Sequence, residues 1–340
     1  MMIFSGKIYW DGALRDGSLE ITDEGRISFS EDLIAGGRKG TVIPSFINGH
    51  THVGDSFINL EPKGNLAEIV GPGGFKHRML ASANEKDVTR SMEASIHIMK
   101  ATGTSAFIDF RESGLKGAEL LKRSDARTGM AVILSRPSSV SEGEELISFT
   151  DGFGMSAISD HNFDLLKDLR QICRRNNRIF AIHFSEASEE NEDMALSLSP
   201  DLLVHCLQAS DEFLTKIHSM GIPVAITPRS NSFYGLSSNY SRLLKKGVKL
   251  LLGTDNCMVT APDMFGEMDF LYRKQRTKGY ISPSEILKMV TGNPRGFLSK
   301  FGVRVPDEYT FFPDIQMTEY ELILRGGYIS REKIKVPRVG

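Results

Sequence analysis

Thr41-Val42-Ile43-Pro44-Ser45-Phe46-Ile47-Asn48-Gly49-His50-Thr51-His52 is the stretch from which the rest of the sequence is interpreted. Its apolar and β-branched residues predict a buried strand with His50 and His52 at the C-terminal end. Side chains two residues apart on a strand point to the same side, so the two imidazoles can bind one ion together. Imidazole suits zinc and other first-row metals. Because histidine pairs also occur in cores and on surfaces, a metal site requires further ligands at later strand ends.

Seven further short apolar runs follow this strand, and most are separated by amphipathic stretches. They are residues 105–110, 130–135, 153–158, 178–183, 202–205, 223–227 and 248–255. Eight continuous apolar strands separated by helices indicate an all-parallel sheet that is buried on both faces. Eight is the number that closes a (β/α)8 TIM barrel, and such barrels carry their chemistry at the C-terminal ends of the strands.

The two ends of the chain have a different pattern. Residues 1–40 alternate short apolar runs with turns, as hairpins do, and the tail from about residue 301 is strand-like again, including Tyr320–Leu324 before a turn at residues 325–327. We therefore predict an α/β protein in which residues 1–44 plus 302–340 form a small composite β-sandwich. Residues 45–301 would form the barrel, which is the catalytic domain.

Composition limits the class of function. The 340 residues are 40% apolar and 25% charged with a net charge of −2, so a large core can form and no basic excess suggests nucleic acid. No stretch approaches 18 apolar residues and the N-terminus lacks the apolar segment of a signal peptide, which argues against a membrane. Three cysteines without a close pair make a disulfide framework or a cysteine zinc knuckle improbable. A cytoplasmic location is the default expectation.

Polar residues fall where a barrel would place its active site. His183 ends the fifth strand, His205 the sixth and Asp255 the eighth, on the same rim as His50 and His52. The other four histidines, at positions 77, 97, 161 and 218, are expected on the surface or in helix packing. His50, His52, His183 and Asp255 are predicted to hold a metal with one position open to water, as catalytic sites do. Such an ion lowers the pKa of its water to about 7.

Two further rim residues suit proton transfer and hydrogen bonding. Glu186 follows His183 by three residues and can reach the substrate without binding the metal, as a general acid–base residue would. His205 is better placed to hydrogen-bond the reacting centre than to act as a fourth nitrogen ligand. Each residue also has a plain structural explanation: Asp255 could cap a helix, Glu186 could be a solvated charge and His205 could be a core histidine with its hydrogen bonds satisfied.

Substrate contacts are expected from other rim positions, namely Arg111, Arg136, Arg229 and Asn231. Arginine forks suit carboxylate, phosphate or ring carbonyl groups, although salt bridges around the barrel mouth explain them equally well. The glycine-rich segment 53–78 precedes a helix predicted to begin at Asn84 and Glu85. A segment of this length is either a lid over the pocket or an ordered surface loop.

The motifs together resemble the amidohydrolase superfamily over essentially the whole chain. They are Pro44–His52, His183-Phe184-Ser185-Glu186, His205, Thr227-Pro228-Arg229-Ser230-Asn231 and Gly253-Thr254-Asp255-Asn256. The chain looks most similar to the mononuclear branch with cytosine deaminase, S-adenosylhomocysteine/methylthioadenosine deaminases and triazine chlorohydrolases. This resemblance implies one divalent metal, Zn²⁺ first and Fe²⁺ as the alternative. Binuclear members carry a lysine at the end of strand four, where this chain has residues 157–160 without one.

The resemblance further implies that the protein deaminates an amino-substituted heterocycle, such as a nucleobase, nucleoside or related ring, through a metal-activated hydroxide. Glu186 would protonate the ring, Asp255 would move the protons of water and ammonia, and His205 would steady the oxyanion. Hydrolysis of an amide, a carbamate or a ring-chloro bond at the same site is the alternative, and a non-catalytic binding protein is a third. The short tail with Pro313-Asp314-Ile315 and the loop after His52 depart from relatives and leave the substrate open. A homodimer is one assembly state open to the chain.

Overall fold

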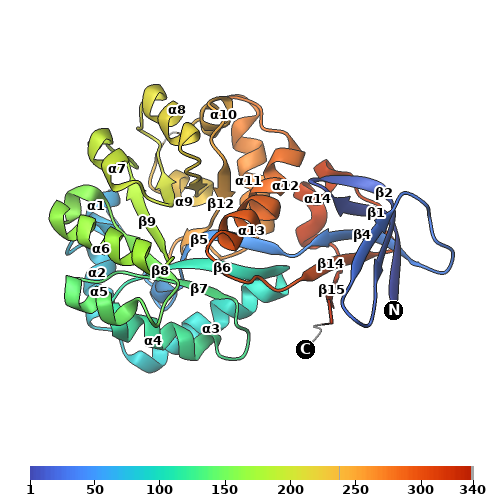
Figure 1. The fold of residues 1–340 in the computed structure, drawn as a ribbon, viewed down its shortest axis with the longest axis horizontal. Coiled ribbons are helices and arrows are strands. Elements are labelled where there is room, and N and C mark those ends of the chain that lie inside the picture. Colours follow the sequence, from blue (N-terminus) through green and yellow to red (C-terminus); the bar gives the residue numbers. More distant parts are fainter. Residues whose placement is uncertain (237, 338–340) are drawn as a thin grey trace.

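The computed structural model describes residues 1–236 and 238–337, which form two separate sheets with helices around the larger one (Figure 1). The larger sheet contains β5 (Phe46–His52), β6 (Thr104–Arg111), β7 (Ala131–Ser135), β8 (Gly152–Met155), β9 (Ile179–Phe184), β10 (Leu202–His205), β11 (Val224–Ile226), β12 (Leu250–Leu252) and β13 (Asp255–Asn256). Its neighbouring strands are all parallel. The predicted strand at residues 153–158 ends early, at Met155, and is followed by a single 3₁₀ turn.

Helices follow most of these strands. They are α1 (Leu66–Val70), α2 (Phe75–Ala81), α3 (Glu85–Ala101), α4 (Gly114–Asp125), α5 (Val140–Leu146), α6 (Phe163–Arg175), α7 (Glu192–Leu198), α8 (Asp211–Ser219), α9 (Pro228–Phe233), α10 (Tyr240–Lys245), α11 (Met264–Gln275), α12 (Pro283–Val290), α13 (Gly292–Ser299) and α14 (Glu319–Arg325), with 3₁₀ turns η1 (Val53–Asp55), η2 (Ile158–Asp160) and η3 (Gly326–Tyr328). The predicted helix after residue 84 is confirmed, and Asn84 caps it by accepting a hydrogen bond from the Lys86 amide. None of the helices in the described part of the chain has the length and apolarity needed to cross a bilayer.

The larger sheet closes on itself through an interrupted last strand. β12 pairs with β11, and after a two-residue break β13 pairs with β5, the first strand of the sheet. The Asn48 side chain joins the seam, because its amide donates to Thr254 Oγ1 at 2.8 Å and its oxygen accepts from the Thr254 amide at 3.1 Å. The predicted (β/α)8 barrel is therefore confirmed, with β12 and β13 together as its eighth strand.

Closure at this seam depends on a glycine. A Cβ at Gly253 would lie 2.6 Å from the His50 amide nitrogen and 2.8 Å from the His50 carbonyl oxygen, both closer than van der Waals contact. A side chain there would push the eighth strand away from the histidine strand. Gly253 thus lets the eighth strand approach the strand that carries His50.

We expect Gly253→Ala to destabilise the protein by about 1–3 kcal/mol, as overpacking of a close contact does. Urea unfolding followed by circular dichroism measures the free energy of unfolding. Gly296→Ala is the matched control: a Cβ there meets nothing within 4 Å, and the site is exposed in α13, so it should raise stability by about 0.5–1 kcal/mol. Equal effects of the two substitutions would contradict the close-approach role of Gly253.

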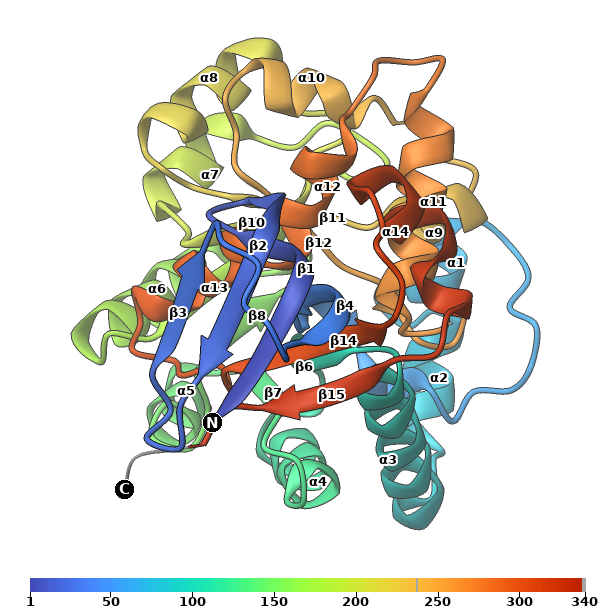
Figure 2. The same cartoon turned by 90° about the vertical axis from the view of Figure 1, so that its right-hand side faces the viewer.

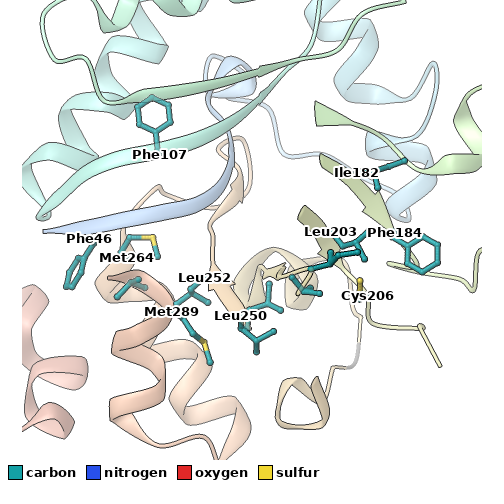
Figure 3. Close-up of a cluster of buried hydrophobic side chains, with 14 of the residues drawn as sticks. Phe46, Phe107, Ile182, Phe184, Leu203, Cys206, Leu250, Leu252, Met264 and Met289 are labelled. Atoms are coloured by element: carbon teal, nitrogen blue, oxygen red, sulfur yellow. The ribbon is translucent and has the colours of Figure 1, made fainter. Parts of the chain in front are cut away.

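Alternate residues along each barrel strand pack on opposite sides. One set, including Ile108, Ala181, Val204 and Leu251, faces the barrel interior and forms one apolar cluster. The other set forms a larger cluster with the surrounding helices, and Figure 3 shows part of it, with Leu250 and Leu252 of β12 near Met264 and Met289 of α11 and α12. This two-sided burial is the physical reason that the strands are continuously apolar.

The two ends of the chain pair into the second sheet, and Figure 2 shows their strands side by side. In order across the sheet these are β15 (Glu332–Lys335), β14 (Glu308–Pro313), β4 (Arg38–Pro44), β1 (Met2–Trp10), β2 (Ala13–Ile21) and β3 (Ile27–Ser30). β4 is parallel to β1 and antiparallel to β14. The predicted pairing of both termini into a separate β structure is confirmed, and the predicted β-sandwich takes the form of one six-stranded mixed sheet. Division into domains at residues 44/45 and 301/302 stays a prediction.

The predicted strand at Tyr320–Leu324 is wrong, because these residues lie in α14. Thr318 and Glu321 form a capping box at the start of this helix, in which each side chain binds the other residue's backbone amide. Leu322 and Ile323 are buried. Five mostly apolar residues have no distinct period, so the capping pair, and not the apolar pattern, decides the structure here.

Candidate active site

The barrel strands bring the predicted ligand residues to one rim. His50 and His52 end β5, His183 is the fifth residue of β9 and Asp255 begins β13. Ile179 and Ala181 of β9 lie in the interior cluster. Because alternate residues of a strand face the same side, the His183 side chain also points into the barrel. The pairing of β5 with β6 is irregular. Beyond this irregularity, the side chains of His50 and His52 point toward the centre of the barrel.

Donor atoms of these residues lie close to one another. His52 Nε2 lies 3.4 Å from His183 Nε2 and 3.6 Å from Asp255 Oδ1, and His50 Nε2 lies 3.3 Å from the same carboxylate oxygen. Ligands about 2.1 Å from a tetrahedral zinc ion are separated by about 3.4 Å from one another. The three separations are therefore of the size expected between neighbouring ligands of one first-row metal ion.

Protonation states also suit a metal. Burial lowers the pKa of His52 to about 3, aided by the charge of Lys76, and burial with the neighbouring imidazoles holds the pKa of His183 well below its usual value. Burial opposes ionisation of Asp255, yet the proximity of His50 and the other imidazoles holds its pKa well below the usual range. Neutral imidazoles and an ionised carboxylate are the forms that bind metal.

The hydrogen bonds around the imidazoles also fit an ion. The His50 side chain is completely buried, and neither of its ring nitrogens makes a hydrogen bond to any described residue. Such orphaned nitrogens are costly unless they bind something. His183 directs Nδ1 to the Met155 carbonyl at 2.8 Å, which leaves Nε2 for the centre. The Phe110 ring packs edge-on beneath His50 and His183, with centroids 4.4 and 5.0 Å away, and closes the floor.

Glu186 and His205 are joined through Asn231. The Asn231 amide donates to Glu186 Oε1 at 2.9 Å and lies 3.3 Å from His205 Nδ1, while its oxygen accepts from the Tyr240 hydroxyl. With Nδ1 accepting, neutral His205 carries its proton on Nε2, which lies 3.3 Å from Glu186 Oε2. Burial, and then the charge of Asp255, raises the pKa of Glu186 well above its usual value. A protonated carboxyl and an imidazole N–H donor therefore face the same point.

Several non-glycine residues at this rim have a strained backbone conformation. Ser185, His205, Cys206 and Asp255 all have positive φ, at 46°, 71°, 53° and 63°. Non-glycine residues rarely adopt this region, and such outliers cluster at functional sites, where the surrounding packing holds them. Here the turns redirect the chain directly after β9 and β10 and at the start of β13, so each strand can present a polar side chain before leaving the barrel.

A pocket of about 270 Å³ opens above these residues. Its walls include His52, Glu112, Arg136, His183, Glu186, His205 and Asp255. The segment 53–78 contributes Leu66, Val70, Lys76 and His77, so this segment forms one wall of the pocket, and its action as a lid stays a prediction. The expectation that His77 is a surface or packing residue is therefore corrected.

The four predicted substrate residues separate into one that lines the pocket and three that do not. Arg136 lines it, and its Nε donates to the Gly154 carbonyl at 3.3 Å. Arg111 is buried behind the wall against Asp109 and Glu112. Arg229 is held by Glu267, with Nε 2.5 Å from a carboxylate oxygen, and so is unavailable to a substrate. Asn231 is buried beside Glu186, which it holds in place.

Two residues of the site were missed by the sequence reasoning. Glu112 directly follows β6, and its Oε1 lies 2.8 Å from His52 Nδ1. The rule that selected Arg111 at this strand end applies equally to its neighbour, so a signal for Glu112 existed. Lys76 reaches the same carboxylate from α2. No pattern in the sequence distinguishes it from any lysine in a loop.

Comparisons with known proteins agree with this fold and these motifs. A model described as the amidohydrolase family matches residues 41–300. A protein of Archaeoglobus fulgidus, provisionally named an aminohydrolase, is 40% identical over 67% of this chain and 68% of its own length. The 5-methylthioadenosine/S-adenosylhomocysteine deaminase of Pyrococcus abyssi is 26% identical over 75% of this chain and 68% of its own. The crystal structure of a Xanthomonas campestris adenosine deaminase with bound zinc is similar in fold, with a TM-score of 0.79, 14% identity and coverage of 99% and 92%.

Proposed function

The chain belongs to the amidohydrolase family, and from this premise we propose that it is a metal-dependent hydrolase that removes an amino group from a small heterocycle. The deaminase names of relatives such as the Pyrococcus abyssi protein support this reaction. The observation that carries the proposal is that the donor atoms of His50, His52 and Asp255 converge and that His183 Nε2 lies 3.4 Å from His52 Nε2. Glu186 lines the adjoining pocket.

The group implied by the family is one divalent ion, and zinc is the first choice, as in the Xanthomonas campestris structure. His50, His52, His183 and Asp255 would hold it through three imidazole nitrogens and one carboxylate oxygen, which are donors that zinc accepts, and a further position would remain for water. When bound, the ion would make water nucleophilic at neutral pH. Fe²⁺ accepts the same donors and is the alternative.

The side chains around the centre divide the proton transfers between them. Asp255, ionised and buried, accepts the proton that the attacking water loses. Glu186, with its raised pKa, enters the reaction protonated and donates to the ring nitrogen next to the carbon under attack. His205 directs its Nε2 proton toward the same point and stabilises the developing negative charge on oxygen. Asp255 then returns its proton to the departing ammonia, and the proton left on the new oxygen passes to Glu186 as the carbonyl forms, which restores the starting carboxyl group.

The pocket wall suggests how the ring is oriented. Arg136 uses one N–H of its guanidinium group for the Gly154 carbonyl, and among the described residues no carboxylate forms a salt bridge with it. The rest of the fork therefore remains for the substrate. A ring carbonyl or an acidic substituent is the partner that such a fork suits. The pocket volume fits a small heterocycle.

Ammonia release tests the proposal. The zinc-loaded protein is incubated with aminopurines, aminopyrimidines and aminopterins, and ammonia is measured with a coupled assay. We expect release from at least one ring class, loss of release after chelation and recovery when Zn²⁺ is added back. Chloride or amide hydrolysis without any ammonia would favour the alternative reaction at the same site. Absence of all hydrolysis by a metal-loaded protein would contradict the enzymatic proposal.

A further inference from the structure

Glu112 is a buried carboxylate whose two oxygens are both in use. Oε1 lies 2.8 Å from His52 Nδ1 and 2.5 Å from Lys76 Nζ, and Oε2 accepts from Arg111 Nη2 at 2.5 Å. The residue is 6% exposed, and the two cations beside it are 3% and 2% exposed. A carboxylate with three charged or polar partners is not free to bind a substrate, although it forms part of the pocket wall.

Its contact with His52 differs from those of the other imidazoles. His183 directs Nδ1 to a neutral backbone carbonyl, whereas His52 Nδ1 lies 2.8 Å from a carboxylate oxygen. An ionised acceptor at His52 Nδ1 keeps the proton on that nitrogen and leaves the Nε2 lone pair for the centre. It also makes the imidazole a better donor toward a cation, as outer-sphere carboxylates generally do.

Lys76 connects this pair to the pocket wall. It is carried by α2, and its Nζ lies 2.5 Å from Glu112 Oε1 and 3.4 Å from Asp55 Oδ2. Asp55 in turn accepts from the Asn256 side chain at 2.9 Å, next to Asp255 on β13. Lys76 therefore links α2, which forms one side of the pocket, to Glu112 beside His52 and to Asp55, which binds the neighbour of Asp255.

We propose that Glu112 is a positioning residue that sets the tautomer and direction of His52, and that Lys76 anchors the segment 53–78 to it. This inference rests on the metal site of the proposed function. The negative charge of Glu112 is expected to favour metal binding in a second way. Without the Glu112 carboxylate, one buried negative charge would be lost beside Lys76 and Arg111, which would keep only their longer contacts with Asp55 and Asp109, and both electrostatics and orientation would then weaken metal binding.

The test is the zinc affinity of the metal-free protein, measured by competition with a chromogenic chelator. We expect Glu112→Gln to weaken zinc binding by about 10- to 100-fold. Glu267→Gln is the matched control, because Glu267 is also a fully buried carboxylate paired with an arginine but contacts none of the proposed ligands. Thermal unfolding of both metal-free variants separates a general loss of stability from a loss of zinc affinity.

Lys76→Met is the second variant, and it keeps the test decisive if Glu112→Gln does not fold. It leaves the His52–Glu112 contact in place, so we expect a smaller loss of zinc affinity and faster proteolysis within residues 53–78. Zinc binding by Glu112→Gln as tight as by the control overturns the positioning role, and unchanged proteolysis of Lys76→Met overturns the anchor. A wild-type protein that takes up no divalent metal overturns the proposed function instead, so the two failures are distinguishable.

Discussion

Glu186→Gln is expected to lower kcat by about 10²- to 10⁴-fold while the protein still binds its metal. The side chain keeps its shape and can still accept the hydrogen bond from the Asn231 amide, which lies 2.9 Å from Oε1 in the wild type. What it loses is the acidic proton that burial and the charge of Asp255 retain at neutral pH. The ring nitrogen then stays unprotonated, and the barrier to forming a tetrahedral carbon rises by about 3–5 kcal/mol.

Steady-state kinetics and metal analysis of the same preparation measure both parts of this expectation. Glu189→Gln makes the same carboxyl-to-amide change three residues along the chain, at an exposed position outside the pocket lining, and should leave kcat unchanged. Full turnover of Glu186→Gln with metal bound would assign the proton to another group. A loss of metal together with activity would mean that Glu186 acts through the ligand set instead.

The barrel could be predicted because its physics is repeated along the chain. A strand buried on both faces must be apolar at every position, so the runs ending near His183 and His205 are visible without any structure. A polar side chain at the end of such a run is unfavourable in the apolar core, so it is expected at the rim of the barrel. This is why His50, His52, His183 and Asp255 could be predicted as one set from position alone. In the structure each has a donor atom 3.3 to 3.6 Å from a donor atom of another member, and their role as metal ligands stays a prediction.

The predictions that failed concern the direction in which a side chain points and the residues, distant in the sequence, with which it pairs. The rim rule gives the position of Arg111 and Arg229 along their strands, but each guanidinium is taken by a carboxylate that the rule does not consider. Glu267, which holds Arg229, lies 38 residues further along the chain on α11. Lys76 depends on the fold of a glycine-rich segment with no regular period. Charge pairing across a barrel mouth is settled by tertiary packing, which leaves no local pattern to detect.

Asp255→Asn should be the most damaging single substitution at the site, with kcat reduced on the order of 10⁴-fold and zinc content far below one ion per chain. Asp255 is the only carboxylate in the proposed ligand set, and its Oδ1 lies 3.3 and 3.6 Å from the Nε2 atoms of His50 and His52. An amide of the same shape supplies no negative charge to a divalent cation. It also cannot accept the proton from the attacking water, so both proposed roles fail together.

Ser230→Ala provides a graded comparison at the same carboxylate. The Ser230 hydroxyl donates to Asp255 Oδ2 at 2.7 Å, and its removal costs one hydrogen bond to a charged group, about 1.5–3 kcal/mol, while the carboxylate remains. Zinc content should therefore stay near that of the wild type, and kcat should fall much less than in Asp255→Asn. Full zinc occupancy in Asp255→Asn would remove this residue from the ligand set. Because Glu186→Gln is expected to keep its metal and Asp255→Asn to lose it, the pair separates the residue that only moves a proton from the one that also holds the ion.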